Sequence, residues 1–151
     1  MFADKLNHNY FTIYMETIRT KYLGSLRTEA EHVASGTKIT TDAPVDNHGK
    51  GEFFSPTDLM AASFGCCALT IMGIAAKTHG FNIDGAEVKT KKIMGVAPRR
   101  IVELEVEFTF PHNGYSNKER KIIELSTKQC PVFNSLNPAI KISQKIAYKE
   151  I

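Results

Sequence analysis

The chain is organised around residues 55–80, which read SPTDLMAASFGCCALTIMGIAAKTHG. This stretch predicts a helix, because Ser55 can cap its start, Pro56 suits the first helical position and Gly80 suits a left-handed stop. Almost every residue between these ends is apolar or small, as in a helix that is buried in a core or spans a membrane. Because the stretch is rich in Gly, Ala and Cys rather than Leu, and strand-like sequence flanks it, we expect a buried central helix and no membrane association.

The length and composition are those of one globular domain spanning residues 1–151. Hydrophobic residues make up 42% of the chain, which suffices for a core without disulfides. The formal net charge of +3 is spread along the chain rather than clustered, and this distribution argues against nucleic-acid binding. The first residues, MFADKLNHNYF, lack the pattern of a secretory signal. Three cysteines, an odd number, do not suit a disulfide-stapled secreted protein, so we expect a cytoplasmic protein with reduced thiols.

Strand-like and helical patterns follow one another along the chain. Residue propensities, alternation and turn residues predict strands over residues 11–22, 26–33, 37–41, 85–94, 101–110 and 139–148. Capping and proline signals predict helices over residues 55–80, 116–128 and 131–136. The resulting order, βββ-α-ββ-α-(short α)-β, predicts an α+β fold with a sheet wrapped around the long apolar helix.

The segment 101–110 shows the clearest alternation in the chain. The residues expected to face the core are Val102, Leu104, Val106, Phe108 and Phe110, and those expected to face water are Glu103, Glu105, Glu107 and Thr109. In the helix predicted over residues 116–128, the apolar side is expected to consist of Ile122, Ile123 and Leu125.

Two adjacent cysteines, Cys66 and Cys67, lie in the middle of the long helix. Successive helical residues point about 100° apart, so the two thiols face different directions, and either could be an ordinary core residue. The third cysteine, Cys130, precedes Pro131. If this proline begins a short helix, Cys130 caps it, and the unpaired N–H groups there favour a thiolate. A cysteine that merely precedes a proline is an equally good interpretation.

Chemistry at Cys67 would require a cation from elsewhere, because the helix dipole fades within one turn and an ordinary cysteine is mostly protonated at neutral pH. The candidates are Arg19, Arg27, Arg99 and Arg100. The five histidines show no metal-ligand spacing with the cysteines, so we expect no metal site. A Cys–His hydrolase is an alternative, since folding could bring a histidine to Cys67.

Two segments taken together resemble the family of osmotically inducible protein C and organic hydroperoxide resistance protein (OsmC/Ohr). They are SPTDLMAASFGCCALT at residues 55–70 and CPVFNSL at residues 130–136, and the likeness extends to ITTDAP at residues 39–44 and PRR at residues 98–100. The resemblance implies an OsmC-like fold, β(3)-α-β(2)-α(2)-β with a long buried central helix. It also implies an intertwined homodimer with active sites at the subunit interface.

The resemblance further implies an activity, the thiol-dependent reduction of organic hydroperoxides to alcohols without a cofactor. On the family pattern, Cys67 is the peroxidatic cysteine that forms a sulfenic acid and Cys130 is the resolving cysteine. Arg27 is the nearest match to the arginine that holds the thiolate. An external dithiol, in the family often a lipoylated protein, would reduce the resulting disulfide.

One position departs from the family pattern. In the hydroperoxide-resistance branch a glutamate follows the helix-start proline and pairs with the arginine, whereas this chain has Thr57 there. The usual partner of Arg27 is therefore missing or replaced, as in the broader OsmC-like branch. This difference supports an alternative, a redox-sensing or small-molecule-binding dimer with weak or no turnover. A Cys–His hydrolase or acyl carrier is a third alternative.

Overall fold

The computed structural model describes residues 16–150, which divide into two compact units, one ending at Ser55 and the other beginning at Pro56. The elements in order are β1 (Ile18–Gly24), β2 (Arg27–His32), β3 (Lys38–Asp42), η1 (Val45–Asn47), α1 (Pro56–His79), β4 (Glu87–Val96), β5 (Arg99–Phe110), α2 (Asn117–Ser126), η2 (Thr127–Gln129), α3 (Pro131–Ser135) and β6 (Lys141–Tyr148). This order confirms the predicted arrangement and adds two short 3-10 segments, η1 and η2. Positions 11–15 of the first predicted strand lie outside the described residues, and the single domain over residues 1–151 stays a prediction.

The N-terminal unit contains a three-stranded antiparallel meander in the order β1-β2-β3. A tight turn joins the first two strands, and Gly24 there has a φ of +88°, which glycine adopts without a steric penalty. After β3 the chain forms the loop of residues 43–54 and returns to the strand, where the Asp42 N–H donates to the Phe54 carbonyl at 3.1 Å. This hydrogen bond closes the loop at its base.

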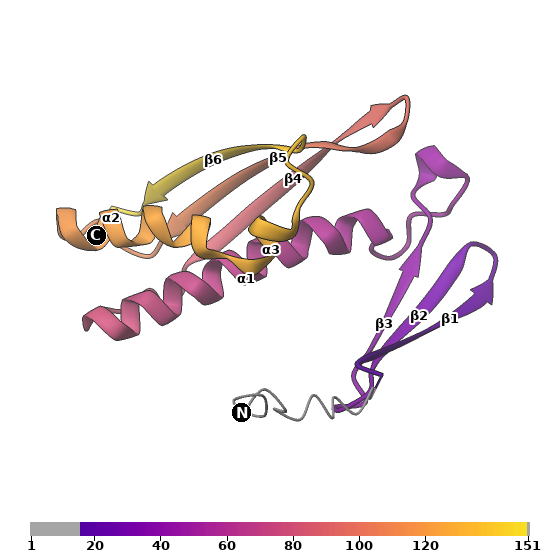
Figure 1. Cartoon of the computed structure of the whole chain (residues 1–151), viewed down its shortest axis with the longest axis horizontal. Coiled ribbons are helices and arrows are strands. Elements are labelled where there is room, and N and C mark those ends of the chain that lie inside the picture. Colours follow the sequence, from indigo (N-terminus) through magenta and orange to yellow (C-terminus); the bar gives the residue numbers. More distant parts are fainter. Residues whose placement is uncertain (1–15, 151) are drawn as a thin grey trace, which may run out of the picture. The chain divides into compact units, whose positions relative to one another are not determined.

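The C-terminal unit packs a second three-stranded sheet, in the order β4-β5-β6, against α1 (Figure 1). β4 and β5 pair antiparallel, whereas β6 runs parallel to β5 after a connection that carries α2 and α3. The strands therefore form two sheets rather than the single sheet expected from the sequence.

Helix α1 confirms the predicted central helix and is buried on one side. Phe64 is fully buried there, and a Cβ on Gly65 would come within 3.0 Å of Val88 on β4, so glycine permits this close approach. Met60 and Ile74 are exposed on the helix. Its length and hydropathy would also suit a membrane span, a property that core helices of soluble proteins share.

The core of the C-terminal unit lies between its sheet and its helices. Its largest fully buried apolar side chains are Phe64, Phe108, Phe110, Met72, Leu104 and Ile123. Burying one such side chain contributes about 1.5–3 kcal/mol, so this cluster is the main source of stability in the unit. Phe110 also stacks on Tyr148 with ring centroids 5.5 Å apart, which ties the ends of β5 and β6 together.

Strand β5 confirms the predicted alternation, with one correction at its start. Ile101 is 4% exposed, whereas Val102, which was expected to face the core, is only partly buried. The pairing with β4 shifts between Ile93 and Met94, which makes Val102 the extra residue of a β-bulge. Because an extra residue reverses the alternation locally, Ile101 takes the inward position.

Helix α2 begins with the predicted capping box. The Ser116 hydroxyl accepts from the Glu119 N–H at 3.3 Å, and the Glu119 carboxylate accepts from the Ser116 N–H at 2.7 Å. Ile123 is buried as expected, but Leu125 is exposed and Ser126 is buried instead. Ser126 follows Ile123 by three residues and shares its face, whereas Leu125 points about 200° away from Ile123.

Candidate active site

Cys130 caps the short helix α3, as predicted. Its sulfur accepts a hydrogen bond from the Phe133 N–H at 3.4 Å, and Pro131 lies in the first turn. Its backbone is extended, with φ −65° and ψ 121°, the conformation favoured before a proline. The residue is fully buried in the core of the C-terminal unit.

Folding brings Cys67 and Cys130 together. Burial raises the pKa of the Cys130 thiol, and a hydrogen bond with Cys67 raises this pKa further. The N–H groups of Phe133 and Val132 act in the opposite direction without reversing the shift. The expectation that capping favours a Cys130 thiolate is therefore wrong, because desolvation outweighs the two N–H groups. Cys130 is held as a thiol beside the partly buried Cys67.

The thiol pair lies in apolar surroundings built by α1 and α3. The rings of Phe64 and Phe133 pack with centroids 6.2 Å apart, and Cys67 and Val132 lie against the same core cluster. Apolar surroundings favour an alkyl group over a charged one. Two hydrogen-bonded sulfurs beside an apolar surface suit thiol–disulfide chemistry on an organic ligand.

Cys66 points away from this pair. It is exposed, whereas Cys67 is partly buried and Cys130 is fully buried. The rotation of about 100° between successive helical residues accounts for the difference between the two neighbours on α1.

Arg27, the predicted activating arginine, begins β2 in the N-terminal unit. Its Nη2 forms ion pairs with Asp42, at 3.4 Å, and with Glu52. Its guanidinium carbon lies 5.1 Å from the centre of the Phe53 ring, within the range of a cation–π contact. Sequence reasoning missed the two carboxylates, because strand pairing and loop closure bring them to Arg27 from distant positions in the chain.

The other candidate arginines lie at exposed positions. Arg19 forms an exposed ion pair with Glu16 at 2.7 Å, and the hydrogen bond from this pair raises the pKa of Arg19. Arg99 and Arg100 are exposed residues at the start of β5. The Arg27 side chain is 26% exposed, so its charge is better shielded from water than that of Arg19, at 64%.

A lysine holds the start of α1, where the sequence departs from the family pattern. Lys92 of β4 donates to the Thr57 hydroxyl at 2.7 Å and pairs with Asp58 at 2.8 Å, and its side chain is 19% exposed. The hydroxyl and the carboxylate therefore anchor a partly buried cation. Sequence reasoning missed this cluster, because it depends on where β4 passes the helix.

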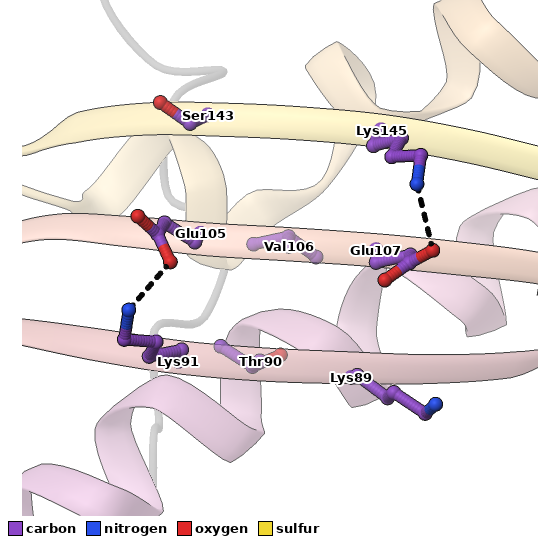
Figure 2. Close-up of a pocket in the computed structure, with 8 residues that line it drawn as sticks. All are labelled: Lys89, Thr90, Lys91, Glu105, Val106, Glu107, Ser143 and Lys145. Carbon is purple, nitrogen blue, oxygen red and sulfur yellow. Dashed lines mark hydrogen bonds and ion pairs between the residues drawn. The ribbon is translucent and has the colours of Figure 1, made fainter.

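The outer face of the C-terminal sheet carries a hollow of about 350 Å³ that is lined mainly by charged side chains. Figure 2 shows Lys91 paired with Glu105 and Lys145 paired with Glu107 across neighbouring strands, at 3.1 and 3.2 Å. Exposed pairs of this kind neutralise each other and contribute little energy. None of the described residues that line the hollow is a cysteine, so the thiol pair is the better candidate.

Comparison with known proteins identifies relatives of this chain. A family model described as OsmC-like protein matches residues 49–145. A crystal structure from Psychrobacter arcticus 273-4, provisionally described as an osmotic stress induced and detoxification response protein, has 42% identity and a TM-score of 0.82, covering 93% of this chain and 100% of that one. No curated protein sequence matched.

More distant structures support the fold alone. An organic hydroperoxide resistance protein from Elizabethkingia anophelis has 18% identity and a TM-score of 0.71, covering 89% of this chain and 98% of that one. An OsmC-like protein from Mycoplasma pneumoniae has 18% identity and a TM-score of 0.73, covering 87% and 94%. These matches confirm the predicted α+β architecture.

Proposed function

The chain belongs to the OsmC-like protein family, and from this premise we propose that it is a thiol-dependent peroxidase that reduces organic hydroperoxides to alcohols. The observation that carries the proposal is the pair of Cys67 and Cys130, in which a partly buried thiol is hydrogen-bonded to a buried one. Structural neighbours that are named organic hydroperoxide resistance proteins support the same reaction class.

The proposed reaction has three steps. The Cys67 thiolate attacks the terminal oxygen of the hydroperoxide; the S–O bond forms, the O–O bond breaks, and the alkoxide leaves as an alcohol after taking a proton. Cys67 is thereby oxidised to a sulfenic acid. The Cys130 sulfur then attacks the Cys67 sulfur, which forms a disulfide and releases water. An external dithiol reduces this disulfide by exchange and is itself oxidised.

The two cysteines have different environments that suit these roles. Burial raises the pKa of Cys130, so this residue waits as a thiol while the more accessible Cys67 meets the substrate. We assign Arg27 as the cation that holds the Cys67 thiolate, because an opposite charge favours the charged form of an acid. The apolar surroundings of the pair favour alkyl hydroperoxides over hydrogen peroxide.

We also propose that the protein is a homodimer with its active sites at the subunit interface. The exposed large apolar residues that motivate this proposal are Ile18, Tyr22, Leu23, Leu26, Ile39, Phe53, Phe54, Met60 and Ile74. Soluble monomers rarely leave large apolar patches exposed, and a second copy of the chain would cover such side chains. Sedimentation should give twice the mass of one chain; the mass of a monomer at micromolar concentration would contradict the dimer.

The peroxidase is tested by replacing each helix cysteine in turn. Cys67→Ser should abolish turnover of cumene hydroperoxide with a dithiol reductant, whereas Cys66→Ser should retain it, because Cys66 points away from Cys130. Intact mass and peptide mapping after one equivalent of hydroperoxide should show a disulfide between Cys67 and Cys130. The reverse result for the two serine variants would overturn the assignment.

A second candidate function is redox sensing without efficient turnover. The observation that favours it is Thr57, which stands where the peroxidase branch has a glutamate and is bonded to Lys92. Steady-state assays separate the two functions. A protein that is oxidised once by hydroperoxide and does not cycle with dithiols is a sensor, and one that cycles is a peroxidase.

A further inference from the structure

Ser63 lies one helical turn before Cys67 on α1, and its side chain is exposed, whereas Cys67 is partly buried. Residues four apart on an α-helix point about 40° apart around the axis, and their Cβ atoms are about 5–6 Å apart. A helical side chain also leans toward the N-terminus of its helix, so the Cys67 thiol leans over the turn that carries Ser63. The hydroxyl and the thiol are therefore neighbours on one side of α1.

The Ser63 hydroxyl makes a hydrogen bond that it can give up. It donates to the Met60 carbonyl at 2.7 Å. This carbonyl also accepts the helical hydrogen bond from the Phe64 N–H, so it keeps a partner when the hydroxyl turns away. Rotation about the Cα–Cβ bond of Ser63 is the only movement required. A hydrogen bond to a charged acceptor is roughly twice as strong as one between neutral groups, so a thiolate at Cys67 is the better acceptor.

The surroundings of Cys67 leave a place for such a donor. Cys130, from the start of α3, is hydrogen-bonded to Cys67 and belongs to the buried core cluster, but a thiol is a weak donor. Helix α1 carries no charged side chain between Asp58 and Lys77. Ser63 approaches from the exposed side of the helix, away from the core, and adds a stronger neutral donor.

We propose that the Ser63 hydroxyl donates a hydrogen bond to the Cys67 thiolate, which it reaches by turning away from the Met60 carbonyl. This inference rests on the proposed function, in which Cys67 is the reacting cysteine. A hydrogen bond to the charged form of an acid favours that form, so Ser63 increases the share of Cys67 that is thiolate. Because both residues belong to α1, the interaction requires no residue of the N-terminal unit.

The test begins from the full-length protein with Cys66→Ser as the parent. Cys66 is exposed and Cys130 is fully buried, so alkylation of this parent by iodoacetamide reports on Cys67. The rate of alkylation is measured by intact mass as a function of pH, and its midpoint gives the ionisation of the Cys67 thiol. Circular dichroism confirms that each variant is folded.

Three variants of this parent isolate the hydroxyl. Ser63→Ala removes the donor, and Ser63→Thr retains it. Thr78→Val is the matched control, because Thr78 is also exposed on α1 and donates to the Ile74 carbonyl at 2.8 Å, but it lies about three turns from Cys67.

Only the loss of the Ser63 hydroxyl should change the ionisation of Cys67. Ser63→Ala should raise the pH midpoint of alkylation by about half a unit, which is about threefold less thiolate at neutral pH. Ser63→Thr and Thr78→Val should match the parent. A Ser63→Ala midpoint that equals the control or moves down would overturn the inference. So would an equal rise in Ser63→Thr, because the hydroxyl would then not be the cause.

The single-turnover rate with cumene hydroperoxide separates a donor from a merely structural residue. Below the midpoint, Ser63→Ala should react about threefold more slowly than the parent; well above it, where Cys67 is fully ionised, the variant should match the parent or exceed it. A loss of the same size at every pH would indicate a structural role and contradict the inference. Failure of the proposed function is distinguishable, because a protein that does not reduce hydroperoxide still yields the alkylation profile.

Discussion

The two units of the molecule differ in where their apolar side chains lie. The C-terminal unit buries large aromatic residues such as Phe108 and Phe110. In the described part of the N-terminal unit, the buried residues are the polar Thr41, Asp42 and Ser55, and most of the large apolar side chains are exposed. A small sheet needs an apolar face packed against another surface to be stable. The C-terminal unit therefore has a core of its own, whereas residues 16–55, the described part of the N-terminal unit, bury no large apolar side chain.

The largest expected effect concerns the N-terminal unit in isolation. A peptide of residues 1–55 should show no cooperative unfolding transition by circular dichroism, because the described part of this unit, residues 16–55, buries no large apolar side chain. The full-length protein, measured in parallel, should show a cooperative transition. A folded peptide with dispersed amide resonances would contradict the proposed difference in packing between the two units.

The next largest effects are expected from replacing one phenylalanine in each unit by alanine. The two replacements should affect different equilibria. Phe108→Ala should lower the free energy of unfolding by about 3–5 kcal/mol, because this side chain is fully buried. Phe54→Ala, at a residue that is 61% exposed, should instead raise the dissociation constant of the proposed dimer at least roughly tenfold, an effect of about 1.4 kcal/mol. Chemical unfolding at two protein concentrations measures both. A large loss for Phe54→Ala that is independent of concentration would contradict the dimer.

Loss of the capping box should have a smaller effect within the C-terminal unit. Ser116→Ala removes the hydroxyl that accepts from the Glu119 N–H and should cost about 1 kcal/mol in the free energy of unfolding. Ser116→Asp retains a capping acceptor and should cost less. Urea unfolding at constant pH distinguishes the two, and equal losses would show that the cap contributes nothing.

Alkaline pH should destabilise the C-terminal unit slightly. Burial raises the pKa of Cys130 from its ordinary value of 9.0, and it also raises the pKa of Tyr115 and Tyr148. A raised pKa in the folded state means that stability is full below the ordinary value and falls as pH rises through the raised one. Under reducing conditions, stability should fall above about pH 9. Cys130→Ala should flatten this fall, while a Cys66→Ala control should not, and a steeper fall in Cys130→Ala would contradict the assignment.

Local signals in the sequence were sufficient for the elements that carry the site. The caps and composition of residues 55–80 predicted α1, and the proline after Cys130 predicted the capped turn of α3. These features depend on neighbours within one or two turns, which a sequence displays directly. The family resemblance was confirmed by the match over residues 49–145, whereas the catalytic roles of Cys67, Cys130 and Arg27 stay predictions.

Features that depend on tertiary contacts were not predictable. The bulge that turns Val102 away from the core is set by pairing with β4. The protonated state of Cys130 is set by how deeply it is buried, which its neighbours in sequence do not reveal. The carboxylates that hold Arg27 arrive through strand register and loop closure. In each of these three cases, parts of the chain that are distant in sequence build the environment of the residue.

The parallel pairing of β6 with β5 has a consequence for biosynthesis. Because β6 completes the sheet, a ribosome must translate residues 141–148 before the C-terminal unit can close. At a synthesis rate of about 5–20 residues per second, Cys67 is translated several seconds before Cys130. A nascent chain therefore carries the thiols of Cys66 and Cys67 for a time before Cys130, which lies beside Cys67 in the folded unit, has been made.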